Sequence, residues 1–183
     1  MLVITTHSDP LLFHEYVEPV LSIVGEAEIA PSSDPRLGEI ALSHGKIIIT
    51  GTAIRDFEFE KHIKNFSFLR EFDGHALGIC AGAQIIMSAF RHRKSGNGII
   101  GKSEVAMEKD DALFGKAGET FHAYFEFSRL VESPDFEPVG FAEGMPVLFR
   151  RVSGKSTMWA SYFHPEVMNR EILSKFVSLG NQE

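Results

Sequence analysis

The chain has 183 residues, of which 44% are hydrophobic and 23% are charged, and its formal net charge is −7. This length predicts a single domain over residues 1–183 with a substantial core. The negative charge argues against broad binding to nucleic acid or to a membrane surface, and no apolar run is long enough to span a bilayer. Cys80 is the only cysteine, so an internal disulfide is excluded and a reducing, cytoplasmic location is expected.

Strands and helices alternate through the first half of the chain. An apolar run at residues 2–6 predicts a buried strand, and apolar residues then recur at helical spacing over residues 10–24, with a kink expected at Pro19. Residues 46–50 centre on three isoleucines, which is typical of a strand buried on both faces of a parallel sheet. The other elements predicted here are a strand at 26–30, a short helix at 34–44, a helix within 57–72 and a strand at 75–79.

The second half of the chain is dominated by predicted strands that are separated by glycine and proline turns. These strands cover residues 99–107, 120–127, 137–141, 147–152 and 156–163. Apolar residues at helical spacing from Ile172 to Leu179 predict a final helix. The whole pattern predicts an α/β fold: a doubly wound, mostly parallel sheet with helices on both faces (flavodoxin-like), plus additional antiparallel strands.

Cys80 occupies the centre of a Gly-x-Cys-x-Gly sequence that joins the predicted strand at 75–79 to a helix-like run at 83–90. Flanking glycines allow a sharp turn that projects the side chain from the end of a sheet. The first N–H groups and the positive dipole end of the helix favour a thiolate. The pattern predicts a covalent nucleophile, and the alternative is a structural cysteine in a glycine-rich turn.

A second cluster of reactive side chains lies near the C-terminus, in Tyr162-Phe163-His164-Pro165-Glu166. His164 and Glu166 are two residues apart on extended chain, so their side chains point the same way. Glu166 can therefore hold one ring nitrogen of His164 while the other faces a thiol, as a nucleophile–base–acid triad requires. The alternative is a histidine at a strand end beside a solvated glutamate.

The segments Gly78-Ile79-Cys80-Ala81-Gly82-Ala83-Gln84 and Phe163-His164-Pro165-Glu166 together resemble the nucleophile and His/Glu motifs of class I, triad-type glutamine amidotransferases. The resemblance runs from Lys46 to the end of the chain. It implies that Cys80 is the nucleophile, His164 the general base and acid, and Glu166 the residue that orients His164. It also implies that Gln84 contacts substrate glutamine and that no cofactor is required. In length, the chain is similar to stand-alone glutaminase subunits such as that of archaeal GMP synthetase.

The expected oxyanion-binding segment departs from the family pattern. Thr50-Gly51-Thr52-Ala53 stands where many members have Ser-Gly-Gly-Pro. The resemblance assigns Gly51 and Thr52 to this site, and the N–H of Thr52 is expected to hold the oxyanion together with the N–H of Ala81. The Cβ of Thr52 restricts the backbone conformations that can aim its N–H.

The segment expected to recognise the other end of glutamine departs as well. Phe121-His122-Ala123-Tyr124 is similar to a family segment that reads Ser/Asn-His-x-x. Phe121 supplies no polar side chain there. Backbone groups of Ala123 and Tyr124 are therefore the contacts expected for the α-amino and α-carboxylate groups.

Residues 96–103 match the phosphate-binding pattern G-x-x-x-x-G-K-[ST]. A phosphate loop must follow a strand and open a helix, whereas here a helix precedes the match and a strand-like run follows it. We therefore expect a hairpin-like turn. The histidines other than His164 show no metal-ligand spacing, and no metal site is predicted.

The favoured function is hydrolysis of glutamine through a thioester on Cys80. Its ammonia is expected to serve a separate synthase subunit, because 183 residues leave no room for an ATP-dependent synthase; the ATP-dependent subunit of GMP synthetase is one candidate. Two alternatives stay open: a stand-alone γ-glutamyl hydrolase that uses the same triad, and a catalytically silent, amidotransferase-like binding or regulatory protein.

Overall fold

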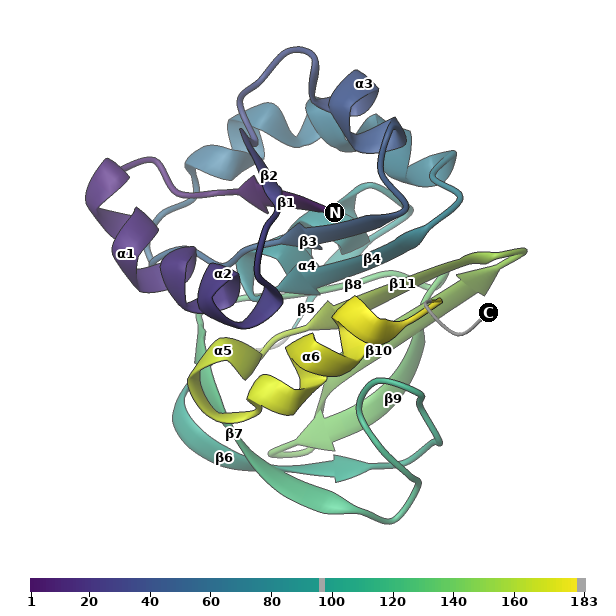
Figure 1. Cartoon of the computed structure of the whole chain (residues 1–183). Helices are drawn as coiled ribbons and strands as arrows, with labels where there is room; N and C mark the ends of the chain where they lie inside the picture. The colour runs from purple at the N-terminus through teal and green to yellow at the C-terminus, as the bar shows by residue number, and fades with distance from the viewer. Residues whose placement is uncertain (96–97, 181–183) are drawn as a thin grey trace.

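The computed structural model of the chain describes residues 1–95 and 98–180. In this part of the chain the main sheet has nine strands in the order β2-β1-β3-β4-β11-β10-β9-β6-β7 (Figure 1). Neighbouring strands are parallel from β2 to β11. These five strands are β2 (Glu28–Pro31), β1 (Leu2–Thr5), β3 (Lys46–Ile49), β4 (His75–Ile79) and β11 (Ser156–Ser161).

The other strands of the main sheet pair antiparallel, beginning with β10 against β11. They are β10 (Met145–Ser153), β9 (Glu137–Ala142), β6 (Ile99–Met107) and β7 (Thr120–Phe127). A separate pair is formed by β5 (Arg93–Ser95) and β8 (Leu130–Glu132). The predicted combination of a mostly parallel sheet with added antiparallel strands is confirmed.

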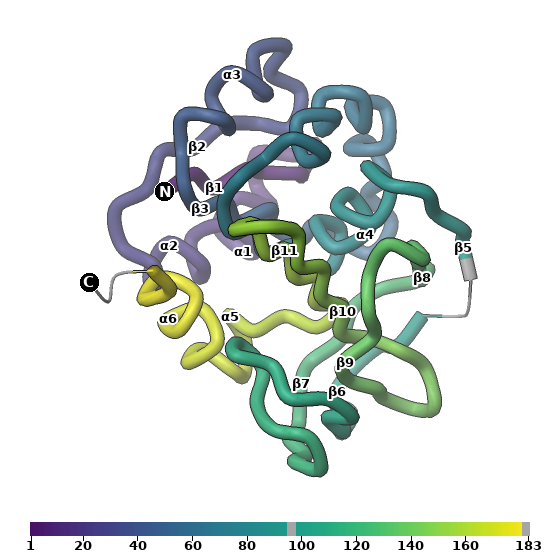
Figure 2. Tube along the Cα trace, turned by 90° about the vertical axis from the view of Figure 1, so that its right-hand side faces the viewer, coloured from purple at the N-terminus to yellow at the C-terminus, as the bar shows by residue number. Residues whose placement is uncertain are grey.

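The helices form two groups that lie on opposite sides of the parallel strands (Figures 1 and 2). On one side, α3 (Leu37–Leu42) and α4 (Ala81–Ser88) both contact the 3₁₀ helix η2 (Glu58–Arg70). The other side carries the 3₁₀ helix η1 (Pro10–Leu12), α1 (Phe13–Tyr16), α2 (Glu18–Val24), α5 (Pro165–Met168) and α6 (Arg170–Ser178). The parallel strands therefore run between two helical layers, and Ile47, Ile48 and Ile49 of β3 are fully buried.

One helical prediction needs correction. The helix predicted over residues 10–24 is divided at Val17, and Pro19 lies in the first turn of α2, where its missing N–H costs no hydrogen bond. The helix predicted within 57–72 is present as the 13-residue 3₁₀ helix η2.

The match to a phosphate loop lies partly outside the described residues, which omit Gly96 and Asn97. Its remainder does not open a helix. Ile99 begins β6, and Lys102 and Ser103 pair with Tyr124 and Ala123 of β7. A strand follows the match as expected, but the strand β5 rather than a helix directly precedes it, and β5 pairs with β8 rather than forming a hairpin with β6.

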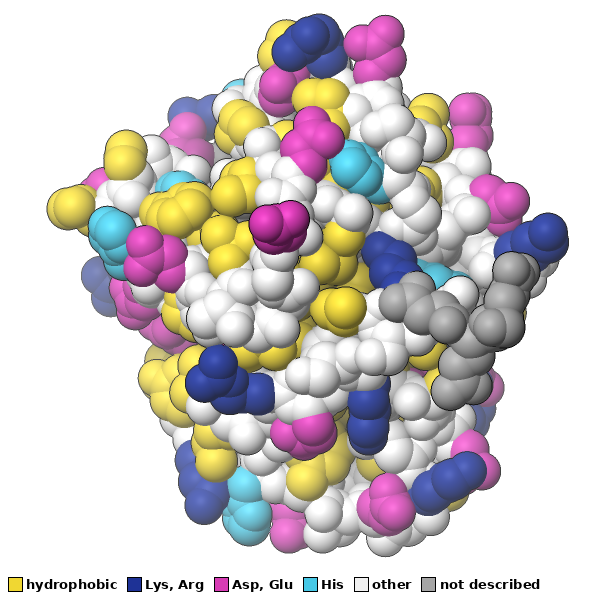
Figure 3. Space-filling view, viewed as in Figure 1, with side chains coloured by type: hydrophobic (Ala, Val, Ile, Leu, Met, Phe, Trp, Pro, Cys, Tyr) yellow, Lys and Arg dark blue, Asp and Glu magenta, His cyan; other side chains and the backbone are white. Residues whose placement is uncertain are grey.

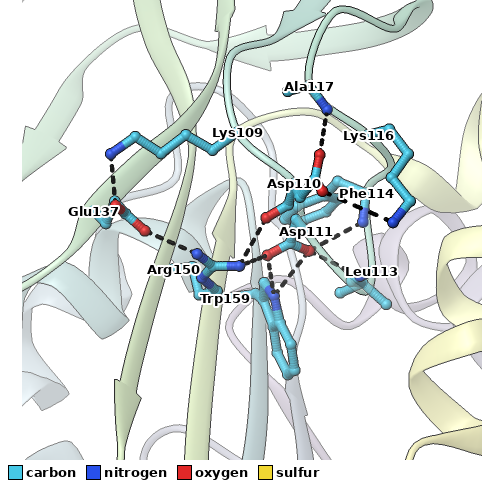
Figure 4. A network of polar contacts seen from close by, with 10 residues as sticks. All are labelled: Lys109, Asp110, Asp111, Leu113, Phe114, Lys116, Ala117, Glu137, Arg150 and Trp159. Carbon is cyan, nitrogen blue, oxygen red and sulfur yellow. Dashed lines mark hydrogen bonds and ion pairs between the residues drawn. The ribbon is translucent and has the colours of Figure 1, made fainter.

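A buried polar network fastens the turn after β6 to the antiparallel strands (Figure 4). The carboxylate of Asp111 accepts hydrogen bonds from the Trp159 indole (3.1 Å) and from the backbone N–H groups of Leu113 (2.8 Å) and Phe114 (3.1 Å). It also pairs with the Arg150 guanidinium at 3.1 Å, and its side chain is fully buried. Removal of this carboxylate leaves several donors without an acceptor.

We expect Asp111→Ala to lower the free energy of unfolding by about 3 kcal/mol, because it leaves the charge of Arg150 without its buried partner. For a chain of this size the melting temperature should fall by roughly 6–12 °C. The neighbouring Asp110 side chain is 67% exposed, so Asp110→Ala is the matched control. Thermal unfolding followed by circular dichroism measures both variants, and equal melting temperatures would contradict a structural role for Asp111.

On the face shown in Figure 3, acidic and basic side chains are interspersed among apolar ones. The described residues on this face form no extended basic patch of the kind that binds nucleic acid. No helix within residues 1–95 and 98–180 is long and apolar enough to cross a membrane.

Candidate active site

Cys80 occupies a strained turn between β4 and α4. Its φ is +52° and its ψ is −102°, a region that residues other than glycine rarely adopt. The glycines on either side permit close approach: a Cβ on Gly78 would lie 2.4 Å from the carbonyl oxygen of Gly82, and one on Gly82 would lie 2.1 Å from that of Ile49. The Gly-x-Cys-x-Gly sequence therefore forms the sharp elbow that the sequence predicted.

His164 and Glu166 reach the same edge of the sheet through β11. This strand runs parallel to β4 with Ser161 beside Ile79, so the segments that follow the two strands emerge together. His164 precedes α5, and its Nδ1 lies 2.7 Å from Oε1 of Glu166. The side chains are 2% and 1% exposed. This contact fixes the ring and leaves Nε2 as the nitrogen available for catalysis.

The charge state of His164 is set by its buried neighbours. Burial disfavours the protonated ring, but the nearby Cys80 and Glu166 outweigh it and hold the pKa of His164 well above its usual value. Among the described residues, Nε2 of His164 has no hydrogen-bond partner. Nε2 is therefore the ring nitrogen of His164 that Glu166 does not engage.

Gly51 lies between the side chains of Cys80 and His164. A Cβ on Gly51 would lie 2.8 Å from Cε1 of His164 and 3.4 Å from Cβ of Cys80. Only glycine fits between them without displacing one. The Cys80 thiol itself donates to the carbonyl oxygen of Glu126 at 3.3 Å, so in this structure its hydrogen bond goes to β7.

The backbone beside Gly51 is held by side-chain hydrogen bonds. The hydroxyl of Thr6 donates to the carbonyl oxygens of Thr50 (3.1 Å) and Gly51 (2.9 Å). Since the Gly51 carbonyl and the Thr52 N–H belong to one planar peptide unit, this anchor also fixes the direction of that N–H. Thr52 is not among the described non-glycine residues with positive φ, so its Cβ meets no left-handed strain here.

Asp56 holds the other side of this loop. It accepts hydrogen bonds from the Thr52 hydroxyl (2.9 Å) and from the backbone N–H (2.8 Å) and hydroxyl (3.0 Å) of Ser8. Burial raises the pKa of Asp56, but these donors and the N–H of Glu58 outweigh it and hold the pKa below its usual value. Ala81 lies in the first turn of α4, where backbone N–H groups have no partner within the helix.

The residues expected to bind the rest of the substrate are only partly brought to Cys80. Gln84 is 5% exposed and lines the small cavity at Cys80. Ala123 is fully buried and does not line it. The Tyr124 ring centroid lies 6.4 Å from that of His164, and the Tyr124 carbonyl accepts a hydrogen bond from the His164 N–H.

Residues further along β7 line the cavity instead, namely Glu126, Phe127 and the following Ser128. Sequence reasoning predicted the strand at 120–127 but placed the contact segment near its start. The period-2 alternation that predicted the strand also puts Glu126 on the same face as Tyr124, and this was the only signal for it. The cavity measures about 10 Å³, close to the least that holds one water molecule, so a molecule the size of an amino acid enters only if neighbouring side chains move.

Tyr16 is a further site residue that sequence reasoning missed. Its hydroxyl donates to the Glu126 carboxylate at 3.1 Å, and its ring centroid lies 5.8 Å from that of His164. Burial and then the Glu126 charge raise the pKa of Tyr16 above its usual range, so the phenol stays protonated. Its partner is 110 residues away, which local sequence patterns cannot indicate.

No cluster of three or more His, Cys, Asp or Glu side chains suited to a metal ion occurs in the part of the chain that the structure describes. The arrangement at Cys80 consists of a thiol on a strained backbone turn, a histidine held by a buried carboxylate, and backbone N–H groups at a loop and a helix start. These are the groups that acyl transfer through a thioester uses.

Comparisons with known proteins identify the family and the fold. A family model described as class I glutamine amidotransferase matches residues 20–179. A GMP synthase subunit from Thermoplasma acidophilum is similar in structure, with a TM-score of 0.77 and 20% sequence identity over 97% of this chain and 93% of that one. A glutamine amidotransferase from Thermotoga maritima has a TM-score of 0.61 and 17% identity over 100% of this chain and 85% of that one.

A chain from the PurLQS structure of Thermotoga maritima is also similar, with a TM-score of 0.63 and 16% identity over 96% of this chain and 94% of that one. At these identities the likeness of the solved structures shows the fold. No curated protein matches the chain by sequence.

Proposed function

The chain belongs to the class I glutamine amidotransferase family, and on that basis we propose that it hydrolyses the side-chain amide of glutamine through a thioester on Cys80 and supplies ammonia to a separate synthase subunit. The observation that carries the proposal is the convergence of the strained Cys80 with the buried His164–Glu166 pair at one end of the parallel strands. A nucleophile that depends on one free thiol suits a reducing compartment such as the cytoplasm.

The first half of the reaction forms the thioester. His164 takes the proton of the Cys80 thiol on Nε2, and the sulfur attacks the carboxamide carbon. The N–H groups of Thr52 and Ala81 hold the developing oxyanion. His164 then gives the proton to the departing nitrogen, the C–N bond breaks and ammonia leaves.

The second half regenerates the enzyme. His164 removes a proton from water, which attacks the thioester, and the C–S bond breaks to release glutamate and the thiol of Cys80. Glu166 keeps Nδ1 of His164 occupied in both halves, so Nε2 is the nitrogen that exchanges protons. The groups of this chain supply every proton transfer.

Ammonia release tests the proposal. We expect the protein, alone or mixed with ATP-dependent synthase subunits such as that of GMP synthetase, to release ammonia from L-glutamine. Release of glutamate and the amine from γ-glutamyl amines, without ammonia from glutamine, would favour the stand-alone γ-glutamyl hydrolase. No release from either substrate under any condition would favour a catalytically silent binding or regulatory protein.

One observation supports the hydrolase as the second candidate. The described residues that line the cavity at Cys80 include the carboxylates of Asp56 and Glu126 but no lysine or arginine. Carboxylates beside the reacting bond favour a cationic leaving group over a neutral one. A γ-glutamyl derivative of a diamine presents such a group after its amide nitrogen.

Thr6 provides a test of the proposed oxyanion site that leaves the triad intact. We expect Thr6→Val to lower kcat roughly 10-fold to 100-fold with little change in KM. Without the anchor, the Thr52 N–H points less directly at the oxyanion, and the transition state loses part of its stabilisation. Thr5→Val is the matched control, since Thr5 is the buried neighbour on β1. Steady-state ammonia release measures both, and equal kcat values would show that the Thr6 anchor does not position the N–H.

A further inference from the structure

The side chain of Thr52 gives the oxyanion segment a point at which it is held from outside its own backbone. Thr52 is 2% exposed, and its hydroxyl donates to the carboxylate of Asp56 at 2.9 Å. Threonine is branched at Cβ, so this hydrogen bond fixes the rotamer and, through Cβ, the position of the Thr52 backbone. A glycine at position 52 would have no side chain to be held.

The carboxylate of Asp56 is itself held on both sides. Its Oδ2 also accepts hydrogen bonds from the backbone N–H (2.8 Å) and the hydroxyl (3.0 Å) of Ser8. Its Oδ1 accepts one from the N–H of Glu58 at 3.1 Å, and the N–H of Asp56 donates to the carbonyl oxygen of Ala53 at 2.8 Å. Asp56 therefore joins the loop after β3 to the segment after β1.

This contact lies at the opposite end of the Gly51–Thr52 peptide unit from the Thr6 anchor. The hydroxyl of Thr6 holds the carbonyl oxygen of Gly51, and Asp56 holds the side chain of Thr52. A planar peptide unit that is held at one end can still turn about the axis between its two Cα atoms. Held at both ends, it keeps its N–H in one direction.

The held segment borders the space in which Cys80 reacts. Thr52 and Asp56 line the small cavity at Cys80, and so does Ala81, which supplies the other proposed oxyanion donor. A donor stabilises an oxyanion only when it lies about 2.7–3.1 Å from the charged oxygen. A displacement of a few tenths of an ångström at Thr52 is therefore enough to slow the reaction.

Resting on the proposed function, we propose that Asp56 is a positioning residue of the oxyanion site, which acts through the Thr52 side chain and holds the Thr52 N–H toward the carbonyl oxygen of the substrate. Asp56 transfers no proton and touches no reacting atom in this role. Thr52 serves through two groups, the N–H that binds the oxyanion and the hydroxyl that Asp56 holds. Loss of their hydrogen bond slows the step that builds charge on oxygen and leaves the Cys80 thiol as reactive as before.

Substitutions at both ends of the hydrogen bond test the assignment in the full chain. Thr52→Val keeps the branched shape, but a methyl group cannot approach the Asp56 oxygen as closely as the hydroxyl does. It should lower kcat for ammonia release from L-glutamine roughly 10-fold to 100-fold with little change in KM. Thr52→Ser keeps the hydroxyl and should retain most of the activity. Asp56→Ala should also lower kcat, and adding Thr52→Val to it should lower kcat no further, because both remove the same hydrogen bond.

The rate at which iodoacetamide alkylates Cys80 separates positioning from a general loss of structure. This displacement builds no charge on a carbonyl oxygen, so Thr52→Val and Asp56→Ala should keep the native alkylation rate. Glu58→Gln is the matched control, because it removes a half-exposed carboxylate two residues from Asp56, and it should keep the native kcat.

Two outcomes would overturn the positioning role and leave the proposed function standing. In the first, native protein releases ammonia from glutamine, and Thr52→Val and Asp56→Ala release it with the native kcat. In the second, both variants lose alkylation rate in step with kcat. If native protein releases no ammonia from glutamine, with or without a synthase subunit, both proposals fall.

Discussion

Cys80→Ser is expected to reduce glutamine hydrolysis by at least about 10⁴-fold, the scale seen when the nucleophile of a triad is lost. A serine hydroxyl is far less acidic than a thiol, so His164 removes its proton less readily. Cys80 is also one of the neighbours that raise the pKa of His164, and its replacement removes that effect. The substitution changes one atom in a residue that is 3% exposed, so the fold should persist. Ammonia release measures the effect.

Because Cys80 is the only cysteine, the same variant has a clean chemical control. A diazoketone analogue of glutamine should alkylate the native protein at one position and leave the variant unlabelled. The variant's melting temperature should match that of the native protein. Glutamine hydrolysis that survives Cys80→Ser at a native-like rate would contradict the mechanism.

Glu166→Gln is expected to lower kcat by about 10³-fold while the fold persists, because an amide in this place no longer holds His164 in the productive tautomer. The carboxylate also raises the pKa of His164, so its loss lowers that pKa. His164 must be neutral to accept the thiol proton. The acid limb of kcat/KM should therefore shift to lower pH as the maximum rate falls.

The pH profile of ammonia release measures this prediction, with Glu171→Gln on α6 as a control that removes an exposed acid nearby. An unchanged rate would show that Glu166 does not orient the base. A shift of the acid limb to higher pH would show that the reactive resting state is a thiolate–imidazolium pair rather than a thiol beside a neutral imidazole.

Local sequence patterns were enough to predict the strands and helices but not which of them lie side by side in the fold. The buried strand β3 was predictable from its three consecutive isoleucines, and the sharp turn at Cys80 was predictable from its flanking glycines, because each depends on residues adjacent in the sequence. The placement of β11 beside β4, which brings His164 to Cys80, pairs segments about 80 residues apart. No periodicity encodes that pairing, and only the family resemblance indicated it.

The site residues that sequence reasoning missed share one property: their partners are distant in the chain. Thr6 anchors Gly51 and Tyr16 anchors Glu126, at separations of 45 and 110 residues. Each is an ordinary polar residue in a local window. Their roles arise only when the fold brings these side chains to one end of the sheet.

The most direct test of a covalent mechanism is a search for the acyl enzyme. Native protein is mixed with L-glutamine, quenched in acid and digested, and the peptide that contains Cys80 is weighed by mass spectrometry. The account predicts a glutamyl adduct on that peptide, with none in Cys80→Ser and slower decay in Glu166→Gln. Turnover of glutamine with no adduct at Cys80, together with undiminished turnover in Cys80→Ser, would contradict it.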